Sequence, residues 1–354
     1  MYQSGGQSPW LDYIRRDMLE NGELVEWIGH GVRGITSNPT ILENAIAKSD
    51  IYVDEIRKLS SEGRNSEQIY ETIAIADIAV ACDQFMPLYQ SSNGGDGFVS
   101  LEVSPALSHD SHGSINEGLR LWGLVDRPNL MIKIPSTEAG VIATRALISQ
   151  GVNVNVTLMF SQEDYLAVAE AYLSGLEDRV RRGLSCSHVR SVASLFVSRV
   201  DTALENDVEN RKDLAGRVAV ANARRLYRSF QHIFSSPRFL ELQTHGAHVQ
   251  RPLFASTGTK NPAFSDVLYV NSLILPATVN TMPTPTLTAF LDHGTVQAVA
   301  PERLEEDDRV LAECETVGID LNQLARKLKL DGLKQFEKSY ESLLQAIADQ
   351  TAQL

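Results

Sequence analysis

Residues 130–136, with the sequence LMIKIPS, form an apolar, strand-like run that has a lysine at its centre. Side chains alternate between the two faces of a strand, so Lys133 shares a face with Met131 and Pro135. A buried ammonium group is costly. A lysine that stays neutral in such surroundings can attack a carbonyl group and form a Schiff base. The alternative is a strand lysine that faces water.

Three other strand-like runs carry polar residues with the same period of two. They are residues 34–39, 98–104 and 153–158, and their polar members include Thr36, Asn38, Ser100, Glu102, Ser104, Asn155 and Thr157. A sheet with one face in water would carry scattered Lys, Glu and Arg on that face instead. Small hydrogen-bonding side chains in these positions indicate a pocket for a polyhydroxylated molecule.

The composition is that of a globular protein with an acidic surface. Of the 354 residues, 43% are hydrophobic, which is enough for a substantial core, and the formal net charge is −13. Nucleic acid and anionic membranes need a basic surface, so neither is expected as a partner. An anionic substrate would need a local Arg or Lys. The three cysteines, Cys82, Cys186 and Cys314, are too scattered for a disulfide framework, and we expect reduced core residues.

No targeting or linker segment is expected. The first nine residues lack a basic region followed by an apolar core, and no apolar run has the length needed to span a bilayer. We therefore expect a cytoplasmic protein whose residues 1–354 form a single domain.

Strand-like and helical patterns alternate along the chain. The strands are expected at residues 9–12, 34–38, 98–103, 130–135, 153–158, 191–196, 251–256 and 278–282, and helices at 42–59, 66–89, 162–176 and 214–234. Eight such units predict a closed α/β (β/α)₈ barrel of parallel strands rather than an open doubly wound sheet. The carboxyl ends of the strands would then bring Asp12, Asn38, Glu102, Lys133, Asn155 and Ser194 to one mouth.

The chain continues beyond the last strand with three amphipathic helical patterns, at residues 286–292, 304–316 and 321–354. We expect residues 300–354 to form a helical extension packed on the wall of the barrel. A lid over the barrel mouth is the alternative.

Eight segments in order resemble the transaldolase family, and most closely its longer bacterial members with an STGTKNP segment. They are WLD (10–12), GITSNPT (34–40), SLEV (100–103), MIKIP (131–135), NVTLMFS (155–161), SLFVSR (194–199), ASTGTKNP (255–262) and TVNTMP (278–283). The resemblance spans residues 10 to about 295. It implies a metal-free, lysine-dependent aldol transfer on sugar phosphates in the pentose phosphate pathway, without a cofactor.

The resemblance assigns catalytic roles to four residues. Lys133 is similar to the Schiff-base lysine, and Asp12 to the base that takes the C4 hydroxyl proton. Glu102 is similar to the acid/base that works through a water held with Thr157. Glu102 could also serve as the partner of a buried cation.

Substrate contacts are implied in the same way. Asn38 and Asn155 are similar to the amides that hold the dihydroxyacetone unit. The structural alternative for both is capping of barrel loops, which the residues alone favour for Asn38. Arg199 is similar to the phosphate ligand.

Ser194 and Phe196 would line the same pocket. Shorter transaldolases use a second arginine for the phosphate, and here Lys260, with Ser256, is the expected substitute.

Metal and nucleotide sites are not expected. The pairs His109/His112 and His245/His248 lack a third ligand. The glycine-rich residues 94–97 precede a strand and not a helix, which does not fit a phosphate-binding loop.

Three functions remain in comparison. The first is transaldolase, and the second is an enzyme similar to fructose-6-phosphate aldolase, which releases dihydroxyacetone. Those aldolases usually have Gln in place of Glu102 and Tyr in place of Phe196, so both residues favour transfer. The third is a non-catalytic barrel that binds sugar phosphates, which the presence of Lys133, Glu102 and Asp12 disfavours.

Overall fold

The computed structural model describes residues 1–208, 211, 213–297 and 301–352. Eight parallel strands close a barrel in sequence order, which confirms the predicted (β/α)₈ fold. The strands are β1 (Gln7–Leu11), β2 (Gly34–Ile35), β3 (Phe98–Glu102), β4 (Leu130–Pro135), β5 (Val154–Met159), β6 (Ser191–Phe196), β7 (Gln250–Ala255) and β8 (Thr278–Met282). All six residues of β4 are buried, as expected for a parallel strand covered on both sides.

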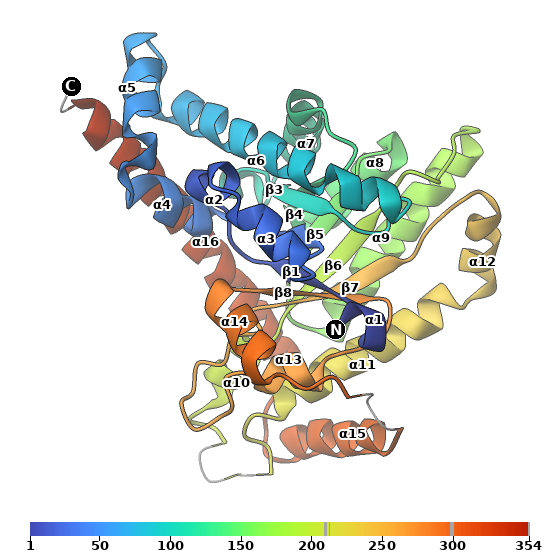
Figure 1. The fold of residues 1–354 in the computed structure, drawn as a ribbon. Helices are drawn as coiled ribbons and strands as arrows, with labels where there is room; N and C mark the ends of the chain where they lie inside the picture. The colour runs from blue at the N-terminus through green and yellow to red at the C-terminus, as the bar shows by residue number, and fades with distance from the viewer. Residues whose placement is uncertain (209–210, 212, 298–300, 353–354) are drawn as a thin grey trace.

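Helices surround this barrel (Figure 1). They are α1 (Tyr2–Gly5), α2 (Arg16–Glu20), α3 (Glu23–Gly29), α4 (Pro39–Ala47), α5 (Val53–Ser61), α6 (Ser66–Ser91), α7 (Ser111–Val125), α8 (Glu138–Gln150), α9 (Gln162–Arg181), α10 (Ser198–Leu204), α11 (Val218–Phe234), α12 (Pro237–Thr244), α13 (Leu268–Ser272), α14 (Thr284–His293), α15 (Pro301–Thr316) and α16 (Leu321–Ala352). Two short 3₁₀ turns, η1 (Asp50–Tyr52) and η2 (Pro105–Leu107), complete the elements. Cys82, Cys186 and Cys314 are free and buried, as predicted.

The single helix expected at residues 42–59 is wrong, because the chain breaks after α4. Ser49 has an extended backbone, and its hydroxyl donates to the carbonyl of Ala45 at 2.7 Å. A serine that hydrogen-bonds to a nearby carbonyl offers the backbone an alternative to the helical ladder. The helix therefore ends here and resumes as η1 and α5.

Helix α6 corrects a second expectation. It has 26 residues and a mean hydropathy of 1.2 in its most apolar window, so by length and composition alone it could cross a membrane. In the structure α6 packs against β3, α7 and α16, and Ile73, Ile78 and Phe85 are fully buried. The apolar character of this helix is thus used in packing against the barrel.

A buried carboxylate lies at the amino-terminal end of the barrel, which we call the floor. Asp96, which precedes β3 and is 2% exposed, accepts hydrogen bonds from Arg33 Nε at 2.7 Å and Arg251 Nη2 at 3.0 Å. Ser8 Oγ donates to the same carboxylate at 2.7 Å. This network joins the starts of β1, β2, β3 and β7.

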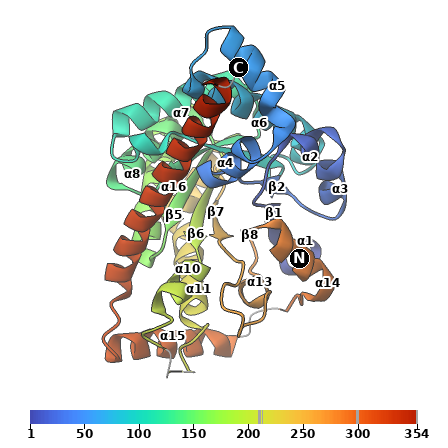
Figure 2. The same ribbon diagram turned by 90° about the vertical axis from the view of Figure 1, so that its left-hand side faces the viewer.

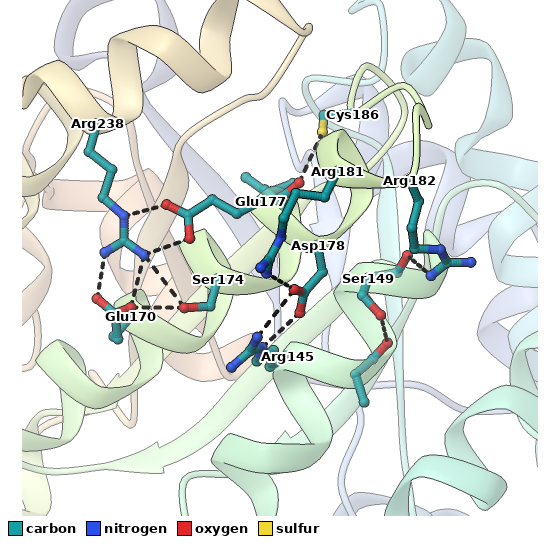
Figure 3. A network of polar contacts seen from close by, with 12 residues as sticks. Arg145, Ser149, Glu170, Ser174, Glu177, Asp178, Arg181, Arg182, Cys186 and Arg238 are labelled. Carbon is teal, nitrogen blue, oxygen red and sulfur yellow. Dashed lines mark hydrogen bonds and ion pairs between the residues drawn. The ribbon is translucent and has the colours of Figure 1, made fainter.

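Outside the barrel, ion pairs connect α8, α9 and α12 (Figure 3). Arg238 of α12 contacts both Glu170 and Glu177 of α9, and Arg145 of α8 contacts Asp178 at 2.7 Å. Because these side chains are largely exposed, each pair adds little to stability on its own.

The last two helices occupy different places. Helix α15 lies along α11 on the outside of the barrel. Helix α16 instead passes in front of the strands in Figure 2 and contacts α4, α6, η2 and β5. Its position across the carboxyl ends of the strands differs from the expected position on the wall. The last two residues of the expected helical segment lie outside the described residues.

Candidate active site

Lys133 and Glu102 form a buried pair at the carboxyl end of the barrel. The strand register places Glu102 of β3 next to Lys133 of β4, and Lys133 next to Asn155 of β5. Lys133 Nζ donates to Glu102 Oε2 and to the carbonyl of Ser37, each at 3.0 Å. The lysine is 4% exposed, so it does not face water. Burial raises the pKa of Glu102, and the charge of Lys133 opposes that rise.

Asp12 follows β1 and faces the same centre. Its backbone N–H donates to the carbonyl of Met282, and its Oδ1 accepts from Thr36 Oγ1 at 2.6 Å. Burial raises the pKa of Asp12, while the Thr36 hydrogen bond and the charges of Lys133 and Arg199 lower it. A buried carboxyl group whose pKa is raised is suited to take up and release a proton.

Asn155 is held by hydroxyl groups on both sides. Its Nδ2 donates to Ser100 Oγ at 3.0 Å, and its Oδ1 accepts from Ser194 Oγ at 2.6 Å. The amide orientation is therefore fixed by neighbouring strands. Thr157, two residues further along β5, is fully buried, and its Oγ1 has no hydrogen-bond partner among the described residues. A buried hydroxyl of this kind is a site at which a water molecule can bind.

Asn38 acts as a helix cap. Its Oδ1 accepts from the backbone N–H of Ile41 at 2.9 Å at the start of α4. This confirms the capping alternative, and it leaves the Nδ2 group for other contacts. Asn38 and Glu102 also line one cavity of about 480 Å³.

Arg199, the predicted phosphate ligand, follows β6 at the start of α10. Its guanidinium carbon lies 5.1 Å from the ring centre of Phe196, which is 8% exposed. Within the described part of the chain, the guanidinium has no hydrogen bond or ion pair. Burial lowers the pKa of Arg199, and the nearby Asp12 carboxylate opposes that effect. An unpaired, largely buried guanidinium is suited to bind an anion.

Ser256 and Lys260, the other two residues predicted to bind phosphate, differ in their position relative to Arg199. Ser256 has a positive φ of 53°, and its Oγ lies 2.9 Å from Ser198 Oγ, next to Arg199 in sequence. Lys260 is exposed and forms no ion pair with any described residue. The structure thus brings Ser256 close to Arg199 but does not bring Lys260 into a contact.

Two residues at the site, Ser37 and Phe336, were not predicted, and the specific role of Thr36 was not predicted either. Ser37 supplies the carbonyl that accepts from Lys133, and Thr36 donates to Asp12. Phe336 of α16 places its ring centre 5.6 Å from Lys133 Nζ. The TSN sequence after the second strand was a signal for Thr36 and Ser37. Nothing in the amphipathic pattern of the last helix indicated that Phe336 would lie there.

The residues that the structure describes contain no cluster of three His, Cys, Asp or Glu side chains that could hold a metal ion. The fold and site define a class of protein, the (β/α)₈ barrel whose mouth holds a buried lysine beside two carboxyl groups and an arginine.

The comparisons with known proteins identify the family. A family model described as transaldolase/fructose-6-phosphate aldolase matches residues 9–347. A transaldolase of Neisseria meningitidis serogroup C is 45% identical over 339 residues, which cover 96% of each chain. A transaldolase of Thiobacillus denitrificans is 44% identical, with 97% of each chain covered. The protein belongs to the transaldolase/fructose-6-phosphate aldolase family. The family match extends beyond residue 295 and includes most of α16.

Proposed function

We propose that this chain is a transaldolase of the pentose phosphate pathway. It would transfer a dihydroxyacetone unit from sedoheptulose 7-phosphate or fructose 6-phosphate to glyceraldehyde 3-phosphate or erythrose 4-phosphate. The observation that carries the proposal is the buried pair of Lys133 and Glu102, at 3.0 Å, in a chain that is 45% identical to a transaldolase.

The first half of the reaction would form the Schiff base. The Lys133 amine attacks C2 of the ketose phosphate, and the resulting carbinolamine loses water to give a protonated imine. Glu102 would deliver and accept the protons of these steps, through a water that also contacts Thr157. The raised pKa of Glu102 and the unpaired Thr157 hydroxyl support these roles.

The second half would break and remake a carbon–carbon bond. Asp12 takes the C4 hydroxyl proton, the C3–C4 bond breaks, and its electron pair moves into the imine to give an enamine on Lys133. The aldose phosphate leaves, and C3 of the enamine attacks the carbonyl carbon of the acceptor, whose oxygen takes a proton from Asp12. Water then releases the product from Lys133.

The remaining residues would position the substrate. Asn155 and the Nδ2 group of Asn38 would hold the hydroxyls of the dihydroxyacetone unit, and Ser194 would fix the Asn155 amide. Arg199 would bind the terminal phosphate with Ser256 beside it, and Phe196 would line the pocket. Lys260 is exposed in the loop after β7, and it would need to approach Arg199 to contribute.

The protein would act in the cytoplasm as one domain, with residues 300–354 as a part of it. Fructose-6-phosphate aldolase activity is the second candidate, since the family includes both enzymes. Glu102 and Phe196 favour transfer over release.

Borohydride trapping tests the proposal. The protein is reduced with sodium borohydride in the presence of fructose 6-phosphate, and its peptides are analysed by mass spectrometry. A dihydroxyacetone-derived mass is expected on Lys133 and on no other lysine. An adduct on another lysine, or none on protein that transfers, would reject the Schiff-base assignment. Comparing free dihydroxyacetone with the transfer product separates the aldolase from the transaldolase.

A further inference from the structure

The Lys133 side chain is almost inaccessible in this structure, and helix α16 contributes a ring to its surroundings. Phe336 is 3% exposed, and its ring lies over Lys133, which is 4% exposed. The amine donates hydrogen bonds to Glu102 and to the carbonyl of Ser37. A ketose phosphate must bring its C2 carbon within bonding distance of Nζ. Some part of this enclosure therefore has to move before a substrate can react.

The backbone of α16 also lies very close to the site. A Cβ atom placed on Gly332 would come within 2.9 Å of the side chain of Leu158 and 3.4 Å of Arg199 Nη1. Only glycine permits this approach without a shift of the helix or of Leu158, which itself has a φ of 58°. Gly332 and Phe336, one helical turn apart, thus cover the phosphate side and the lysine side respectively.

Polar contacts hold α16 at both ends of the covered region. Lys329 Nζ donates to the carbonyl of Ser136 at 2.8 Å and to Asp164, a residue whose other oxygen caps α9. At the other side, Ser339 Oγ lies 2.8 Å from Thr40 Oγ1 of α4. These polar contacts are partly exposed. The helix also buries an apolar face that includes Leu328, Leu333 and Leu343, so opening has to expose part of that face.

The segment before α16 has the form of a hinge. Helix α15 ends at Thr316, and Gly318 follows with a φ of 82°. Asp320 then caps α16, because its Oδ1 accepts from the N–H groups of Asn322 and Gln323. Two separately terminated helices joined by four residues can change their angle without unfolding either one.

A second route into the site is disfavoured by charge. The cavity of about 480 Å³ that reaches Glu102 is also lined by Glu67, Glu71, Glu117 and Arg120. Arg120 already pairs with Glu71 and Glu117. The excess of carboxylates would repel a phosphorylated sugar.

We propose that α16 is a hinged cover of the active site, which must swing away from β5 and α4 to admit and release sugar phosphates, and whose Phe336 excludes water from Lys133 when closed. The substrate class follows from the function proposed above, whereas the movement of α16 rests on the contacts alone. Two contacts hold the closed position: the hydrogen bond between Ser339 and Thr40, and the bonds of Lys329 to Ser136 and Asp164.

A reversible tether tests the movement. The hydroxyl oxygens of Thr40 and Ser339 lie 2.8 Å apart, so Thr40→Cys with Ser339→Cys places two thiols within reach of a disulfide. The three native cysteines are buried and do not compete for the oxidant. We expect the oxidised double variant to lose transfer activity by at least about tenfold, and a reductant to restore it. The two single variants, oxidised in the same way, are the controls. Full activity in a completely oxidised double variant would overturn the proposal and favour entry through the cavity.

A second readout does not depend on the proposed activity. Reductive methylation with formaldehyde and cyanoborohydride, followed by peptide mass analysis, measures how often Lys133 is exposed. The disulfide should slow methylation of Lys133 relative to the surface lysines, and Lys329→Met should accelerate it several-fold. Lys334→Met, on the exposed face of the same helix, should leave the rate unchanged. Unchanged rates in the tethered and Lys329 variants would refute a moving cover even if the reduced enzyme transfers normally. Normal tethering effects with no transfer in the reduced enzyme would instead reject only the proposed function.

Phe336 has its own test. Phe336→Ala should increase the release of free dihydroxyacetone relative to transfer, because water then reaches the enamine. Phe336→Leu keeps an apolar side chain and should restore the parent ratio in large part. A ratio that is equal in all three proteins would show that Phe336 does not exclude water.

Discussion

The two ends of the barrel differ in whether their buried charged groups are paired. At the floor, Asp96 is matched by Arg33 and Arg251 and accepts a further bond from Ser8. At the mouth, the Arg199 guanidinium has no partner in the described part of the chain, and burial raises the pKa of both Asp12 and Glu102. The Asp96 carboxylate is satisfied by groups of the protein itself, whereas the mouth keeps a guanidinium that a substrate would satisfy.

This difference indicates that the floor contributes to stability and that the mouth contributes to catalysis. In (β/α)₈ barrels the active site lies at the carboxyl ends of the strands, and the opposite end contributes to stability. An unpaired buried charge costs folding free energy, so the unpaired Arg199 guanidinium beside two desolvated carboxyl groups at the mouth indicates that these groups serve another purpose. Substitutions at the floor should therefore affect unfolding, and substitutions at the mouth should affect turnover.

Lys133→Ala should have the largest effect on turnover. Transfer should fall by roughly a thousandfold or more, because the variant lacks the amine on which the Schiff base would form. Lys133→Arg should do the same, since a guanidinium remains charged. Both proteins should stay folded, because Glu102 already has a raised pKa and can take up a proton when its partner is removed. Measurable transfer in either variant would contradict the assignment.

Asp96→Ala should have the largest effect on stability. It leaves Arg33 and Arg251 without their buried carboxylate, which should cost about 3–5 kcal/mol of the free energy of unfolding. Urea denaturation measures the loss, and transfer per folded molecule should change little. The control is Arg145→Ala in the network outside the barrel, whose exposed pair with Asp178 should matter much less. Similar losses in the two variants would remove the distinction between the floor and the surface.

Arg199→Ala should weaken the use of phosphorylated donors. Loss of charge-assisted hydrogen bonds should cost about 2–5 kcal/mol of transition-state binding, measured as kcat/KM for fructose 6-phosphate. Unphosphorylated fructose should be almost indifferent, and equal losses with both sugars would show a structural role. Lys260→Ala should give a smaller loss of the same kind, in keeping with its exposed position.

Much of the mouth could be predicted from the sequence, because its residues lie on strands. A period of two and the parallel order of strands are enough to place Glu102, Lys133 and Asn155 side by side, and the register confirms this row. The family resemblance then supplied roles for these residues. The floor was not predicted, since the glycine-rich residues 94–97 were considered only as a phosphate-binding loop.

The position of α16 could not be predicted in the same way. An amphipathic pattern shows that one face of a helix is buried, but it does not show which surface covers that face. Contacts between Phe336 and Lys133 join residues about 200 positions apart, and no local signal specifies them. The break after α4 was missed for a different reason, because one serine side chain ended an otherwise helical pattern.

Phe196→Tyr tests how the mouth controls the covalent intermediate. Phe196 lies beside Arg199 and Phe160 and offers no proton to the enamine. A tyrosine hydroxyl could orient a water or deliver a proton, so release of free dihydroxyacetone from fructose 6-phosphate should rise several-fold relative to transfer. The two rates are measured in one preparation. An unchanged ratio would mean that Phe196 contributes only to packing.

Asp12→Asn should have the smallest effect. It tests whether the buried Asp12 carboxylate at the mouth lowers the free energy of unfolding. Because the folded pKa of Asp12 is raised, the native state holds this proton at pH values where the unfolded chain has lost it. Stability from this group is therefore present at low pH and is lost as the pH rises from the ordinary carboxylate value through the raised one. Asparagine cannot ionise, and its Oδ1 can still accept from Thr36, so the variant should become more stable than the parent as the pH rises through that window. Thermal unfolding at several pH values measures the difference, with Asp331→Asn on the exposed face of α16 as the control. If the stability difference between Asp12→Asn and the parent does not change with pH, ionisation of Asp12 does not destabilise the fold. The contrast between the two ends of the barrel would then depend on Arg199 and Glu102 alone.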